Sequence, residues 1–309
     1  MVGTAHVLLD LSSRPENVPV VRQAIAGFAD AIELARADLY DVSTAVTEAC
    51  NNVSLHAYAA EGPVEVELLA AGGSLLAAVR DRGVGLAPSD APVAIGHAHD
   101  VDGRIAGIGL PAIHGLASRV RLSERDRGGT EVAMEFDAPA SDRDGLASEP
   151  GQPDRPTEPS SFGHRWRRFA RARPVPEQLE RHAIAPARLA ETIELEMAPL
   201  RTACMVLPRV LYAAGAQAYF PVDRLEDLRR VCAGLFEPGG CWSPSSRIQA
   251  GVQIVPGYLE LRVGPLRAED FAPLVAVARE LDPAIEGPMP VPGGEGPGRV
   301  LLRVPRTPI

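Results

Sequence analysis

Glu48 and Asn52 are spaced so that both side chains could act on one ligand. They lie four positions apart in a segment with helical apolar periodicity, so they project from the same side of one helix, one turn apart. A carboxylate at such a place can take a proton, and a carboxamide oxygen can coordinate a hard cation. Polar residues on a plain exposed helix face have the same spacing, so the pair alone does not define a site.

A second candidate group follows a predicted strand in the run VRDRGVG, residues 79–85. Asp81, at the end of the strand, can accept a hydrogen bond from an amino group such as N6 of adenine. Gly83 and Gly85 permit tight turns and a close approach of ligand to backbone. The alternative is an ordinary turn from strand to loop.

Two further glycine motifs come later in the chain. Gly107-Ile108-Gly109 precedes a predicted helix, whose first amides would offer a site for an anion such as phosphate. Gly128-Gly129-Thr130 places a hydroxyl at the start of a predicted strand. Each motif is weak evidence when it is taken by itself.

The four motifs together resemble, in order and spacing, the N, G1, G2 and G3 boxes of the GHKL superfamily of ATPases and kinases. Within that superfamily the run TEACNNVSLHAY, residues 47–58, resembles the corresponding helix of the anti-sigma factor serine kinases of sporulation and stress responses. The resemblance covers residues 5–137. It implies a general base at Glu48, a magnesium ligand at Asn52, an adenine contact at Asp81 supported by Thr130, a phosphate-covering loop shaped by Gly83, Gly85, Gly107 and Gly109, and a place near the nucleotide for Asn51 and Arg104.

The elements expected around these motifs form one domain over residues 1–137. Apolar spacing predicts helices over 18–34, 38–58 and 110–117, and strands over 6–11, 64–69, 74–81, 120–125 and 130–136. This order predicts an α+β two-layer sandwich, a mixed sheet with helices on one face. The resemblance implies that it is the Bergerat-type ATP-binding fold.

The remainder of the chain is predicted to hold a linker and a degenerate second copy. Residues 138–190 begin with a stretch rich in Pro, Ser, Asp and Gly, and contain the basic aromatic segment 165–173. A shift of 186 positions aligns 7–48 with 193–234 without a gap, so the domain at 191–309 is expected to repeat the element order. Glu48 then falls on Gly234 and Asn52 on Pro238, so this copy should lack the nucleotide motifs. Two unrelated α/β domains are the alternative.

Composition narrows the functions further. The formal net charge of −9 argues against direct binding of nucleic acid, and the absence of lysine excludes a P-loop lysine. No apolar run reaches the roughly 20 residues that span a membrane, and no signal peptide is evident, so a cytoplasmic location is expected. The four cysteines form no CxxC pair and are expected to be reduced.

The function predicted from these observations is that of an anti-sigma factor and protein serine/threonine kinase dependent on ATP and Mg²⁺, acting in transcription regulation. Its partners would be a sigma factor and an anti-sigma antagonist of the STAS type, which the kinase phosphorylates. Two alternatives stay open at this point: a non-catalytic, nucleotide-gated binding regulator, and the catalytic subunit of a histidine kinase system. The protein is expected to be either a homodimer or an intrachain pseudo-dimer.

Overall fold

The first half of the chain folds as the periodicity of its apolar residues dictates. The computed structural model describes residues 4–85, 109–126, 128–137, 192–236, 242–243, 246–266, 270–281, 285–293 and 296–306. In the first half the elements are β1 (Ala5–Ser12), η1 (Pro15–Asn17), α1 (Val18–Ile32), α2 (Arg36–Asn52), the π-turn η2 (Val53–Ala57), β2 (Pro63–Ala71), β3 (Ser74–Asp81), α3 (Gly109–Leu116), β4 (Arg119–Glu124) and β5 (Thr130–Asp137).

Helices α1 and α2 each bury one apolar stripe against the sheet. The stripes recur at intervals of three and four residues, as one face of a helix requires. They comprise Val20, Val21, Ala24, Ile25 and Phe28 in α1, and Val42, Ala45, Val46 and Ala49 in α2. Burial of these side chains, at roughly 25 cal/mol per Å² of apolar surface, fixes which side of each helix faces solvent.

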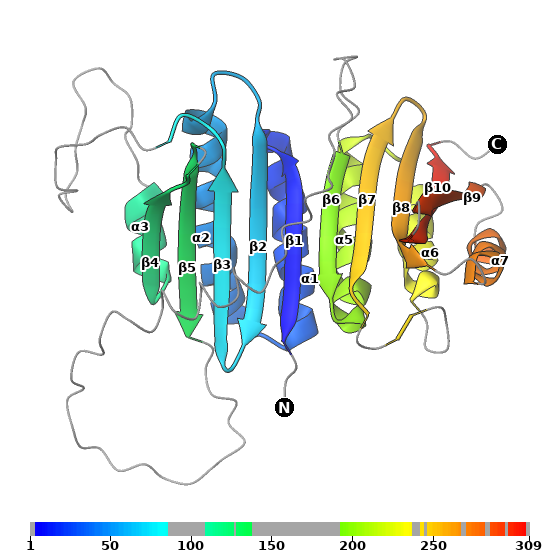
Figure 1. The fold of residues 1–309 in the computed structure, drawn as a ribbon, viewed down its shortest axis with the longest axis horizontal. Helices are drawn as coiled ribbons and strands as arrows, with labels where there is room; N and C mark the ends of the chain where they lie inside the picture. Colours follow the sequence, from blue (N-terminus) through cyan, green and yellow to red (C-terminus); the bar gives the residue numbers. More distant parts are fainter. Residues whose placement is uncertain are drawn as a thin grey trace, which may run out of the picture. The chain divides into compact units, whose positions relative to one another are not determined.

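The strands of the described residues form one sheet of ten, in the order β4-β5-β3-β2-β1-β6-β7-β8-β10-β9 (Figure 1). Helices α1, α2 and α5 pack on one face of it, which confirms the two-layer α+β arrangement. Every described strand pair is antiparallel, whereas the sequence analysis expected a mixed sheet. The reason lies in the connections, because two successive helices between β1 and β2 return the chain in the opposite direction.

The second half has the same order of elements as the first. They are β6 (Thr192–Ala198), α5 (Leu200–Gln217), α6 (Val222–Leu235), β7 (Ile248–Val255), β8 (Tyr258–Leu266), α7 (Phe271–Leu281), β9 (Glu286–Gly293) and β10 (Gly296–Pro305). Strand β9 was not predicted, because Pro288, Pro290 and Pro292 argue against a strand. It lies at the edge of the sheet, where a missing N–H is tolerated.

The two halves meet edge to edge through β1 and β6. Leu9 lies directly opposite Leu195, and Val7 lies opposite Met197. Leu9 and Leu195 are equivalent under the shift of 186 positions, so the register is centred on a pair of equivalent residues. The order of strands outward from this pair is the same on both sides, which makes the sheet a pseudo-twofold arrangement within one chain.

Helices α1 and α5 pack against each other beside this strand junction. Gly27 permits the close approach, because a Cβ on it would lie 2.5 Å from the carbonyl oxygen of Met205. At the surface, Arg209 of α5 pairs with Asp30 of α1, and Arg201 donates to Glu33 at 2.9 Å. The positive side chains lie on α5 and the negative ones on α1, so the two sides of the junction are not chemically alike.

The opposite face of the first half carries a buried ion cluster around Arg80. Its guanidinium lies 2.6 Å from Glu65, 2.7 Å from Glu67 and 2.6 Å from Glu131, and its side chain is only 8% exposed. His6 lies 2.8 Å from Glu67. Burial acts to raise the pKa of Glu67, but the hydrogen bond with His6 and the charge of Arg80 outweigh it and lower that pKa to about 2. The cluster therefore links strands β1, β2, β3 and β5 through ion pairs and a hydrogen bond that share Arg80 and Glu67.

The linker expected at 138–190, with its basic segment 165–173, lies outside the described residues. The described residues on both sides belong to one compact unit, made of residues 1–139 and 190–309. The limits of the domains at 1–137 and 191–309, and the origin of the second half as a degenerate copy, stay predictions.

Candidate functional site

The C-terminal part of α2 carries three half-buried polar side chains, Glu48, Asn51 and Asn52. Glu48 and Asn52 lie one turn apart beside the buried Ala45 and Ala49, as their spacing predicts. Within the described residues, none of the three polar side chains has a hydrogen-bond or ion-pair partner. An acid and two amides at the edge of a buried stripe are therefore available to a ligand.

The α2 helix ends earlier than the sequence analysis expected. It was predicted to run to Tyr58, but regular α-helix stops at Asn52 and a π-turn spans Val53–Ala57. Widened turns of this kind are frequent at functional sites. The turn places the carbonyl oxygen of Ala57 where the amide of Val84 donates to it at 3.0 Å. The end of α2 is thereby attached to the segment that follows β3.

Asp81 ends β3 on the same side of the sheet as the helices. Alternation along the strand puts it on the face of Val79, and Asp81 is 3% exposed. Its Oδ1 accepts a hydrogen bond from the amide of Gly83 at 2.7 Å. Within the described part of the chain, no protein donor reaches the second oxygen, Oδ2. A buried carboxylate with one oxygen fixed and the other open can accept a hydrogen bond from a ligand.

Glycines allow three backbone segments to meet around Asp81. A Cβ on Gly83 would lie 2.0 Å from the carbonyl oxygen of Ala57, and one on Gly129 would lie 2.3 Å from that of Asp81. Gly129 also adopts φ +91, a region that disfavours side chains. Gly85 follows at φ +78, where the described segment ends. The strand end is held between the π-turn and the β4–β5 turn.

The remaining predicted residues are partly covered by the structure. Thr130 begins β5, is half-buried and lies opposite Glu124 in β4. Gly109 is the first residue of α3, so the predicted helix start is close to the observed one. Arg104 and Gly107 lie outside the described residues. Since α2 packs against β3, β5 and α3, the described candidates lie on elements that contact one another.

Two residues at this site were not singled out from the sequence, Tyr58 and Arg125. The hydroxyl of Tyr58 accepts a hydrogen bond from the amide of Arg82 at 2.7 Å and donates to the carbonyl of Pro63 at 2.6 Å. The guanidinium of Arg125 donates to the carbonyl of Asp81 at 3.1 Å. The contacts of Tyr58 with Arg82 and of Arg125 with Asp81 have no local sequence signal, because each joins segments that are far apart in the chain.

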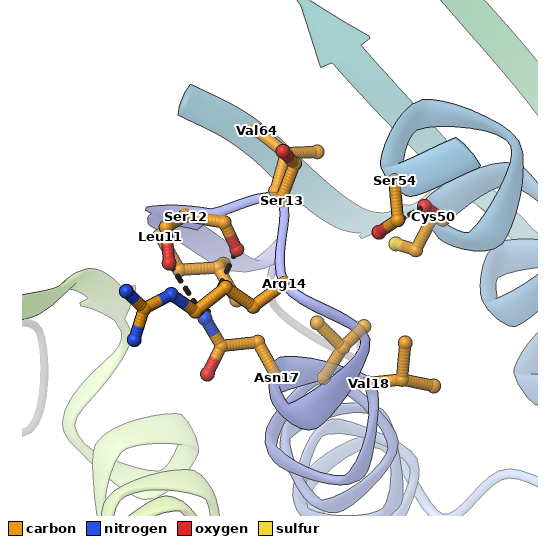
Figure 2. Close-up of a pocket in the computed structure, with 10 residues that line it drawn as sticks. Leu11, Ser12, Ser13, Arg14, Asn17, Val18, Cys50, Ser54 and Val64 are labelled. Carbon is orange, nitrogen blue, oxygen red and sulfur yellow. Dashed lines mark hydrogen bonds between the residues drawn. The ribbon is translucent and has the colours of Figure 1, made fainter. Parts of the chain in front are cut away.

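A small pocket lies on the other side of α2 and is distinct from this site. Figure 2 shows Cys50 of α2 and Ser54 of η2 with Ser13, Asn17 and other lining residues around it. It is small and partly open to solvent. Burial raises the pKa of the Cys50 thiol to about 12, so this cysteine is an inert thiol.

The second half places different residues at the equivalent positions. Strand registers connect Leu9, Val66 and Val79 across β1, β2 and β3, and Leu195, Ala250 and Val263 across β6, β7 and β8. Two residues beyond Val79 is Asp81, and two residues beyond Val263 is Pro265. The helices begin at Arg36 and Val222, which keeps the shift of 186 and puts Gly234 at the place of Glu48. Pro238, at the place of Asn52, lies outside the described residues.

Two further features concern the described residues only. None of their helices combines the length and apolar character needed to cross a membrane. They also contain no group of three or more His, Cys, Asp or Glu side chains placed to hold a metal ion.

Comparison with known proteins places the first half in a family. Residues 11–136 match the family model of the histidine kinase-like ATPase domain. The anti-sigma F factors of two strains of Clostridium kluyveri are each 25% identical over 127 residues, which is 41% of this chain and 89% of each relative. The RsbU and RsbW domain structure of Rv1364c from Mycobacterium tuberculosis is 23% identical, with a TM-score of 0.32 over 42% of this chain and 32% of that one. Residues 11–136, which contain Glu48, Asn52 and Asp81, thus form a domain of the histidine kinase-like ATPase type.

Proposed function

We propose that the first half binds ATP with Mg²⁺ and transfers the γ-phosphoryl group to a serine hydroxyl of a partner protein. One observation carries the proposal: α2, with Glu48 and Asn52 unpaired within the described residues, packs against β3, which ends in the buried Asp81. A base, a metal-binding amide and a carboxylate that can read an amino group are the parts that such a transfer needs. The match to the ATPase family supports the choice of nucleotide.

Asp81 is the residue proposed to recognise adenine. Its Oδ1 is held by the amide of Gly83, which leaves Oδ2 to accept from the 6-amino group of the base. Thr130, at the start of the neighbouring strand β5, is proposed to support this contact. A buried charged acceptor discriminates well, because a base without the amino group would leave it unpaired.

Asn52 fits the role of a magnesium ligand that works together with the nucleotide. Mg²⁺ is commonly held by one or two protein oxygens plus substrate phosphates, and here the described residues offer no cluster of acids that could hold it alone. The carboxamide of Asn52 is half-buried and unpaired within the described residues, and Asn51 is proposed to lie near the phosphates. Bound Mg²⁺ would offset negative charge on the transferring phosphoryl group. Arg104 and four glycines of the two Gly-x-Gly motifs are also proposed to border the phosphates. These glycines are Gly83, Gly85, Gly107 and Gly109.

Glu48 is proposed to act on the attacking hydroxyl. It lies one turn before Asn52 on the same edge of α2, so a serine hydroxyl brought to the γ-phosphate would lie within reach of its carboxylate. In this position Glu48 orients the hydroxyl and accepts its proton.

The proposed partners follow from the names of the similar proteins. Both Clostridium kluyveri proteins are called anti-sigma F factors. We propose that this protein likewise binds a sigma factor, and that the phosphorylated serine belongs to an antagonist of the STAS type. The role in transcription regulation and the cytoplasmic location belong to the same proposal.

Phosphorylation assays on purified full-length protein test the kinase proposal. With labelled ATP, Mg²⁺ and candidate antagonists, label should appear on serine, and Glu48→Gln should lower the rate about a hundredfold or more while ATP binding persists. Glu226→Gln, on the exposed face of α6, is the matched control and should change neither. Unchanged regulation of the sigma factor by Glu48→Gln would favour the non-catalytic regulator. Acid-labile label on a partner histidine would favour the histidine kinase subunit.

The second half is proposed to take the place that a second protomer would occupy. The junction of β1 with β6 and of α1 with α5 uses the edge by which another first half could pair. A mass measurement in solution should therefore find one chain per particle. A tight homodimer formed through β1 would contradict this.

A further inference from the structure

Tyr58 joins the end of α2 to the strand end that holds Asp81. Its hydroxyl donates to the carbonyl of Pro63 at 2.6 Å and accepts from the amide of Arg82 at 2.7 Å. Its ring lies against Gly62, where a Cβ would come within 2.2 Å of the ring carbon Cε1. Packing of the ring against Gly62 therefore sets the direction of the side chain, and its hydroxyl bridges Pro63 and Arg82.

The backbone that follows the Asp81 carboxylate is held by hydrogen bonds. Arg82, the next residue, is held by Tyr58 through its amide, while the carbonyl of Asp81 accepts from Arg125 at 3.1 Å. The amide of Gly83 then donates to Asp81 Oδ1 at 2.7 Å. These contacts hold the peptide plane between Asp81 and Arg82 and one oxygen of the carboxylate, which limits the direction of the free oxygen, Oδ2.

The Tyr58 hydroxyl contributes more to geometry than to folding. Both of its hydrogen bonds lie at the surface, where water can replace them at little cost. Burial first, and then the charge of Asp81, raise the pKa of Tyr58, so the phenol stays protonated at neutral pH and can donate and accept at once. Ligand recognition is more demanding, because productive contacts need their atoms held within a fraction of an ångström.

We propose that Tyr58 is a positioning residue for base recognition, which acts by fixing the Arg82 amide and thereby the direction of the Asp81 carboxylate. The inference rests on the proposed function, since it assumes that Asp81 reads the 6-amino group of adenine. Tyr58 itself need not touch the nucleotide. Its hydroxyl should therefore affect discrimination between bases, which a merely structural residue would not.

Nucleotide binding to the full-length protein tests this with two ligands. ATP carries the 6-amino group, and inosine triphosphate carries an oxygen in its place. Tyr58→Phe keeps the ring on Gly62 and removes only the hydroxyl, so affinity for ATP should fall about three- to tenfold while affinity for inosine triphosphate changes little. Tyr212→Phe, on α5 of the second half and 37% exposed, is the matched control and should change neither affinity.

A double-mutant cycle with Asp81→Asn decides whether Tyr58 acts through Asp81. If it does, Tyr58→Phe should change ATP affinity less than about twofold once Asp81 has been replaced, because the two effects are coupled. Equal losses for both nucleotides, additive effects in the cycle, or no effect of Tyr58→Phe would each overturn the inference and leave ATP binding intact. A wild-type protein that binds neither nucleotide would overturn the proposed function, and this inference with it.

Discussion

The two halves of the sheet have the same order of elements but different chemistry at equivalent positions. Asp81 in the first half corresponds to Pro265 in the second, and Glu48 corresponds to Gly234. The apolar positions that build the layers are kept in both halves, whereas the polar positions that could act on a ligand are not. The fold therefore depends on the buried stripes, and a site is a separate set of residues placed on that fold.

The segment after the second helix shows the same contrast. In the first half, a π-turn leads to Tyr58, whose hydroxyl holds the end of β3. In the second half, Trp242 donates its indole N–H to the carbonyl of Leu235 at 3.1 Å and packs against Phe236, with ring centroids 6.0 Å apart. Trp242 is 9% exposed. The segment after α6 is thus held by packed aromatic rings, whereas the segment after α2 is held by hydrogen bonds.

The largest difference between the halves is expected for nucleotide affinity. Asp81→Asn should lower ATP affinity about a hundredfold, because a hydrogen bond to a buried charged group is worth up to about 3 kcal/mol. Pro265→Ala, at the equivalent place in β8, should leave it unchanged. Titration calorimetry on the full-length variants measures both. Equal losses in the two variants would show that nucleotide binding is not confined to the first half.

Replacing a turn glycine by alanine should lower the free energy of unfolding more in the first half than in the second. Gly129 and Gly257 both adopt positive φ, +91 and +83, but only Gly129 faces backbone, while Gly257 faces open space. Gly257→Ala should therefore cost about 1 kcal/mol of strain, and Gly129→Ala about 2–3 kcal/mol because a clash is added. Chemical denaturation of both variants gives the comparison. Equal costs would mean that the β4–β5 turn moves away from Asp81 without penalty.

Low pH should reduce the folding stability of the first half, because Glu67 becomes protonated. The equivalent residue of the second half is Gly251, which has no ionisable side chain. The folded-state pKa of Glu67, about 2, is below the ordinary value of 4.5, so its stabilisation is complete above the ordinary value. It is lost as the pH falls through the folded value, and amounts to roughly 3 kcal/mol, because one pKa unit corresponds to about 1.4 kcal/mol. In denaturation curves, Glu67→Gln should be less stable at pH 7 but lose less stability between about pH 5 and pH 2. Parallel pH profiles of the two proteins would contradict the assignment.

The smallest effect is expected at the surface of the junction between the halves. Arg209→Ala removes the pair with Asp30, and both side chains are more than a third exposed, so stability should fall by less than about 1 kcal/mol. Thermal unfolding at low and high salt checks this, since the difference between variant and wild type should shrink as salt rises. A loss of several kcal/mol would mean that the ion pair, rather than Gly27 and the strand pairing, holds the junction.

Sequence patterns predicted the elements of the first half and the repeat order, because buried stripes repeat at fixed periods. They failed where long-range packing decides. Strand β9 contains three prolines and is tolerated only because it lies at an edge, and α2 widens into a π-turn where Ala57 meets Val84. Glu48, Asn52 and Asp81 could be selected by type and spacing. Tyr58 and Arg125 could not, since their partners are fixed by the tertiary structure.

The pairing of Leu9 with Leu195 has a consequence for how the protein responds to its surroundings. Subunits that associate from solution separate on dilution, so their assembly changes with expression level. Here the two edges belong to one polypeptide, and their pairing is set by an effective local concentration that dilution does not change. The pairing of the two edges within one chain therefore does not depend on the amount of protein that the cell makes.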